Sequence, residues 1–258
     1  MGSIVCYLPY RFIYWIVIFF DMRSYKRDGN NRVVFSKDMT LVELIDADYM
    51  LLTILQRMGI ELPFGDVTIE QLCRKYEISV TLFLMICQIY ACADYEPEVK
   101  ELQDCDLQHI LRYLRASHRY YLESLLPSIE RGVERVLDSC DPKQSAILRK
   151  FYADYAEEVR AHLRYEESVI FPHVDSLMDG DISEARMADF MAEHTDVCDK
   201  VNDIKSIVIK YLPESCATTQ RCDLLHELYA MRDDLAKHTL IELKLLTPMA
   251  VLAERRIA

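Results

Sequence analysis

The chain has 258 residues, of which 30 are lysine or arginine and 42 are aspartate or glutamate, giving a net charge of −12 at pH 7. This acidity argues against nucleic-acid binding through a broad basic face, and 51% hydrophobic residues allow a sizeable core. Only six glycines and eight prolines are present, and the long periodic runs between them predict an all-α protein.

The first 39 residues are predicted to be an N-terminal extension outside the fold. Residues 12–20 are nine apolar residues in a row, whereas a membrane span needs about 20. The stretch also lacks the basic region and the cleavage site of a signal peptide. We therefore expect translation to start at Met22 rather than Met1, with a weak membrane tether as the alternative.

Residues 40–93 are predicted to form a small helical domain. Thr40 with Glu43 and Thr68 with Gln71 have the spacing of two capping boxes. A helix is expected from residue 40 to about 58, ending at Gly59, and a shorter one after Thr68. The apolar stretch 78–93 is expected to be a third helix.

Four longer helices are predicted in the segment 106–250, over about 106–138, 144–175, 183–211 and 220–246. The last is expected to stop before Pro248. Because the connections are short, neighbouring helices should be antiparallel. The sequence therefore predicts an up-down-up-down four-helix bundle that follows the small helical domain.

Each of these four helices has one histidine on its apolar stripe, and the second and fourth add a glutamate one turn later on the same face. At about 1.5 Å per residue, all four histidines fall at nearly the same depth in the bundle. The remaining histidines, at 109, 173 and 226, are expected at helix ends or on the surface. The predicted ligands are His118, His162, Glu166, His194, His238 and Glu242.

Six such groups buried in one layer predict a bound cation, because without one their burial would be very unfavourable. A structural zinc site closes with four ligands and usually includes cysteine. Six ligands shared by two ions leave open positions, and imidazole with bridging carboxylate suits iron, with manganese as a competitor. We therefore expect two non-haem iron ions bridged by Glu166 and Glu242, with or without an oxo bridge, that bind oxygen, nitric oxide or peroxide.

Three further acidic residues lie close to these ligands. Glu158 and Asp234 each stand one turn before a ligand histidine on the same face, and Glu193 directly precedes His194. Carboxylates in such places orient imidazoles and line ion paths. The alternative is ordinary solvated charge on a helix, and the sequence favours neither.

The stretches "HLRYEESVIFPH" (162–173), "AEHTDV" (192–197) and "KHTLIELKLLTP" (237–248) resemble the haemerythrin-like (HHE) domain. More narrowly, they resemble the di-iron family that repairs damaged iron–sulfur clusters, because Cys198 stands where oxygen-carrying haemerythrins have an extra histidine. Residues 40–79 resemble the short helical domain of that family. The cysteine pair usual there is absent, so thiol chemistry is not expected from this domain.

The resemblance implies a stress-response protein that repairs iron–sulfur clusters damaged by oxidation or nitrosation. An oxygen- or nitric-oxide-binding sensor or carrier is the alternative, and a metal-free helical interaction module is a third hypothesis. The implied partners are iron–sulfur proteins as clients, small gaseous ligands and a second copy bound through the N-terminal domain, with no nucleic acid. Nine cysteines without a C-x-x-C indicate reduced thiols and a cytoplasmic location. Whether the protein is an enzyme stays open.

Overall fold

The computed structural model describes Gly29, residues 33–138, Cys140, residues 142–181, Met187, and residues 198–257 except Ser215. Within these residues every regular element is helical, which confirms the predicted all-α class. In the same part of the chain, no helix combines the length and apolar character that crossing a membrane requires. The apolar stretch 12–20 lies outside the described residues.

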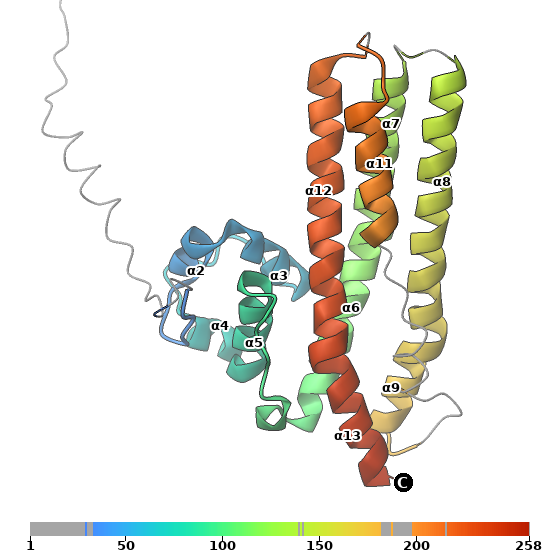
Figure 1. The fold of residues 1–258 in the computed structure, drawn as a ribbon. Coiled ribbons are helices and arrows are strands. Elements are labelled where there is room, and N and C mark those ends of the chain that lie inside the picture. Colours follow the sequence, from blue (N-terminus) through green and yellow to red (C-terminus); the bar gives the residue numbers. More distant parts are fainter. Residues whose placement is uncertain are drawn as a thin grey trace, which may run out of the picture.

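Long antiparallel helices form the bundle shown in Figure 1. Three of the four predicted helices are present, and each is interrupted by a short π-helical segment, after which it continues. The third is described only at Met187 and from Cys198 onward. In chain order the elements are α6 (Asp104–Tyr120), η3 (Tyr121–Leu125), α7 (Leu126–Leu137), α8 (Pro142–Tyr165), η4 (Glu166–Ile170), α9 (Phe171–Met178), α11 (Cys198–Lys210), α12 (Thr218–Ile241), η5 (Glu242–Leu246) and α13 (Thr247–Ile257).

The π-helical segments explain why one predicted helix end was wrong. Pro127, Pro172 and Pro248 each follow a π-helical segment by two residues. Proline has no N–H group and collides with the carbonyl four residues earlier in a regular α-helix. In all three segments the residue before the proline donates its N–H to the carbonyl five residues back. This wider turn accommodates the proline, so the last helix continues to Ile257 instead of stopping before Pro248.

The small N-terminal unit contains α2 (Leu41–Ala47), η1 (Tyr49–Leu51), α3 (Leu52–Arg57), α4 (Ile69–Lys75) and α5 (Val80–Ala91). Both predicted capping boxes are present, each with its two reciprocal hydrogen bonds. The helix expected from residue 40 to 58 is interrupted at Asp48, whose carboxylate accepts the Met50 N–H and so starts a new turn. Gly59, with φ +73°, ends this helical stretch.

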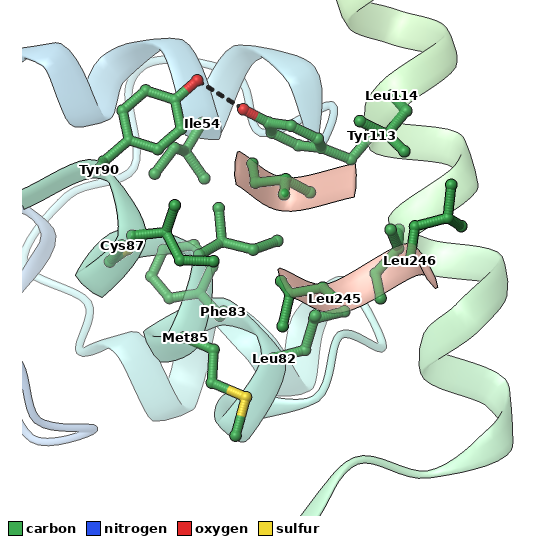
Figure 2. Packing of buried hydrophobic residues seen from close by; sticks show 14 of the residues in the cluster. Ile54, Leu82, Phe83, Met85, Cys87, Tyr90, Tyr113, Leu114, Leu245 and Leu246 are labelled. Atoms are coloured by element: carbon green, nitrogen blue, oxygen red, sulfur yellow. Dashed lines mark hydrogen bonds between the residues drawn. The ribbon is translucent and has the colours of Figure 1, made fainter. Parts of the chain in front are cut away.

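The N-terminal unit packs against the lower half of the bundle, where both contribute to one hydrophobic core. Figure 2 shows Leu82 of α5 beside Leu245 of η5, and Phe83 and Leu246 belong to the same core. The side chains of residues 33, 35 and 39 are also buried in this core. The boundary expected at residue 39 therefore needs correction, because residues before it already belong to the fold.

A second hydrophobic core fills the upper half of the bundle, where α7, α8, α11 and α12 meet. At this end a disulfide joins Cys140 to Cys216, with their Cα atoms 6.1 Å apart. The expectation that all cysteines are reduced is therefore wrong for this pair. Because disulfides persist mainly in oxidising compartments, the pair does not support the cytoplasmic location that the cysteine content indicated.

Candidate metal centre

Four of the predicted ligands meet between the helices, at the level where the two hydrophobic cores adjoin. His118 comes from α6, Glu166 begins η4, His238 lies near the end of α12, and Glu242 begins η5. All four side chains are buried, and one potential ligand atom from each lies within 4.8 Å of the others. Helices that are far apart in the sequence thus bring imidazole and carboxylate groups to a single point.

Glu166 is the centre of this cluster. Its Oε2 lies 3.1 Å from Nε2 of His118 and 3.9 Å from Nε2 of His238, and its Oε1 lies 3.1 Å from Nε2 of His162. On the opposite helix, Nε2 of His238 is 2.9 Å from Oε1 of Glu242. The predicted His-x-x-x-Glu spacing therefore does place each carboxylate next to the histidine one turn earlier.

Both carboxylates occupy the first position of a π-helical segment. Such segments occur mostly as single turns inside α-helices and are frequent at functional sites. Tyr121 takes the corresponding position in η3 on the helix of His118. Its ring meets the His238 ring edge-on, with centroids 5.6 Å apart. The same local distortion thus recurs on three helices at the level of the cluster.

The charges of the cluster are strongly coupled. Burial alone would raise the pKa of Glu166, but the close imidazoles of His118, His162 and His238 hold that pKa well below its usual range. Burial alone would lower the pKa of His238, but Glu242 and Glu166 raise it to about 10. For His162 the opposing effect of burial is likewise outweighed by Glu166 and Glu242, which raise its pKa. In the metal-free protein, protons on the imidazoles therefore balance the buried carboxylates.

The donor set suits a metal cation. Both Glu166 oxygens are buried and receive no hydrogen bond of normal geometry, although imidazole nitrogens surround them. Ligands on opposite sides of one ion, bonded at about 2.1 Å, lie about 4.2 Å apart. The cluster has nearly this size, so a cation could replace the protons with small side-chain shifts.

The other predicted site residues have different positions. His162 lies beside Glu166, with 13% of its side chain exposed, and forms the solvent-facing edge of the cluster. Glu158 pairs with Lys200, and Asp234 pairs with Arg57. His194 and Glu193 lie outside the described residues. His173, expected at an end or on the surface, is buried and bonded to Glu254.

Glu167 was not among the predicted site residues. Nδ1 of His118 donates to its carboxylate at 2.8 Å, so that Nε2 faces Glu166. The Arg115 guanidinium lies 3.6 Å from the Glu167 carboxylate and 2.6 Å from that of Asp175. These two ion pairs hold Glu167 in place beside His118. The sequence signal was the second glutamate of "EE" at 166–167. Helix geometry turns it towards the neighbouring helix rather than onto the face of His162.

Replacing Glu167 by glutamine is expected to weaken metal binding about 10-fold, because carboxylates that orient ligand histidines typically contribute 10–100-fold in affinity. Competition with a chelator would measure this change. Glu157→Gln is the matched control, since Glu157 lies in the preceding helix with a 63% exposed side chain. Equal affinities for the two variants would contradict the role of Glu167.

A helical bundle with buried imidazoles and carboxylates from several helices defines a class of cation-binding proteins. Residues 109–250, more than half of the chain, match the family described as Hemerythrin HHE cation binding domain. The chain belongs to this family, as its ligand-bearing stretches indicated.

Among curated proteins, the chain is similar to the iron–sulfur cluster repair protein YtfE of Salmonella paratyphi B, Salmonella newport and Salmonella heidelberg. Each is 27% identical over 150 residues, which cover 57% of this chain and 66% of the relative. The match thus spans just under two thirds of the length of these relatives. It confirms the resemblance to the repair family.

Proposed function

We propose that this chain is a non-haem di-iron protein of the stress response that takes part in repairing iron–sulfur clusters damaged by oxidation or by nitric oxide. The observation that carries this proposal is the buried cluster of His118, Glu166, His238 and Glu242. The similarity to Salmonella proteins named for iron–sulfur cluster repair supports the repair role. The proposal keeps a cytoplasmic location, although a disulfide such as Cys140–Cys216 is more usual in an oxidising compartment.

In this proposal the Glu166 carboxylate would be shared by the two ions. One of its oxygens faces His162, and the other faces His118 and His238. Glu242, beside His238, is the second bridging candidate, and His194 is the sixth proposed ligand. When bound, iron would supply open positions for oxygen, nitric oxide or peroxide. The surrounding buried side chains exclude water, and His162 leaves one edge through which ions could exchange.

The decisive experiment is metal analysis of protein produced in iron-rich medium, together with its absorption spectrum and an iron-transfer assay. We expect about two irons per chain and a spectrum typical of paired ferric ions. Incubation with a metal-free iron–sulfur protein should then restore that protein's cluster and deplete this chain of iron. Protein that contains manganese or no metal after such treatment would contradict the di-iron assignment.

The alternative is an oxygen- or nitric-oxide-binding sensor or carrier, which a haemerythrin-type cation-binding domain would also suit. The same preparation distinguishes the two functions. Reversible gas binding with full retention of iron, and no transfer to the cluster protein, would favour the sensor or carrier. Iron loss that follows client repair would favour the repair role.

A further inference from the structure

Arg57 is a buried cation of the N-terminal unit that reaches into the bundle. It is the last residue of α3 and is only 5% exposed. Its Nη1 donates to Oδ1 of Asp234 and to the Tyr90 hydroxyl, both at 2.9 Å, and its Nη2 donates to the other Asp234 oxygen. This two-pronged arrangement fixes the relative orientation of α3 and α12, because a guanidinium and a carboxylate pair in one plane.

Tyrosines enclose the guanidinium on the remaining sides. The rings of Tyr113, Tyr120 and Tyr121 lie 5.7, 5.5 and 5.2 Å from its central carbon. The hydroxyls of Tyr90 and Tyr113 are hydrogen-bonded to each other (Figure 2), and their oxygens are 2.7 Å apart. Arg57 is therefore desolvated, and its interactions are stronger than those of an exposed arginine.

Of these residues, Tyr121 contacts the metal centre, and Asp234 and Tyr113 lie on helices that carry its ligands. Asp234 stands one turn before His238 on α12. The Tyr121 hydroxyl donates to the Asp234 main-chain oxygen at 3.4 Å, while the Tyr121 ring packs against the His238 ring. Tyr113 belongs to α6, the helix that carries His118. A side chain of the N-terminal unit thus holds the segments that precede two ligands.

We propose that Arg57 is a positioning residue of the metal centre, through which docking of the N-terminal unit controls how firmly the centre holds its metal. This inference rests on the proposed metal-binding function. While Arg57 is in place, it pairs with the buried Asp234 carboxylate. This pairing fixes the rotation of α12 about its axis and its position along that axis. Without Arg57, that carboxylate would have to move towards water, and His238 and Glu242 would move with the helix.

The test uses full-length, iron-loaded protein and measures the rate of iron loss to a strong chelator at a temperature where every variant is folded. Arg57→Gln and Asp234→Asn are each expected to release iron at least tenfold faster than the wild type and to change its absorption spectrum. The double variant should be little faster than either single variant, because the two residues act as a pair. Arg57→Lys keeps the positive charge but loses the two N–H groups that pair with both oxygens of Asp234. Its rate of iron loss is expected to be three- to tenfold higher than that of the wild type.

Leu148→Ala is the control for a purely structural effect, because Leu148 is fully buried in the other core. It should lower the melting temperature and leave iron release and the spectrum close to wild type. Arg57 variants that release iron no faster than Leu148→Ala would overturn the inference while leaving the proposed function intact. Wild-type protein that binds no metal would overturn both.

Discussion

Replacing Glu166 by alanine is expected to abolish metal binding almost completely. Its carboxylate is fully buried and faces the Nε2 atoms of three histidines, so its loss removes a ligand that two ions would share. Since carboxylates that only orient ligands contribute 10–100-fold, a loss greater than about 100-fold is expected here. Metal analysis after desalting, together with chelator competition, would measure it.

The Glu166→Ala experiment has two matched comparisons. Glu166→Gln keeps the shape of the side chain and removes its negative charge, and it should also lose metal, because the amide is a poor bridging ligand. Glu157→Ala removes a carboxylate of the preceding helix that is 63% exposed and should bind metal like the wild type. If Glu166→Ala retained two ions per chain, the proposed ligand set would be wrong.

Those features of the fold that depend on local chemistry were predictable from the sequence. A capping box is a pair of hydrogen bonds across three residues, and the boxes at Thr40 and Thr68 are both present. The helix end expected before Pro248 was wrong because proline was taken to end the helix. The wider turn of a π-helical segment instead accommodates the proline, so the helix continues although Pro248 has no N–H to donate. Residues 33–39 could not be placed, because their burial depends on contacts with distant helices.

That the buried histidines and glutamates come together was predictable for a geometric reason. Helical periodicity sets the direction of each side chain, and short connections set its depth, so His118 and His238 could be brought together from positions 120 residues apart. The role of Asp234 could not be read in this way. It lies on the ligand face, but its partner Arg57 is 177 residues away in another unit. A pair of side chains from two units that are far apart in the sequence has no periodic signal.

The pKa shifts of the cluster give the metal-free protein an unusual pH dependence. The pKa of His238 is about 10, against an ordinary value of 6.5. A group whose pKa is raised on folding stabilises the fold fully below its unfolded pKa, and this contribution is lost as the pH rises towards the folded pKa. Glu166, whose pKa is lowered, stabilises the fold above its unfolded pKa and loses that contribution in acid. The metal-free protein should therefore be most stable in mildly acidic solution.

Raising the pH from 6.5 to 9 is expected to lower the free energy of unfolding of metal-free protein by on the order of 3 kcal/mol, because one pKa unit corresponds to about 1.4 kcal/mol. Metal-loaded protein should show the opposite trend, since cations bind imidazoles in their neutral form and bind more tightly as protons leave. Urea unfolding of both forms across this range would measure the two slopes. In His238→Gln the metal-free slope should be much flatter. If metal-free His238→Gln had the same slope as the wild type, protons on groups other than His238 would balance the buried carboxylates.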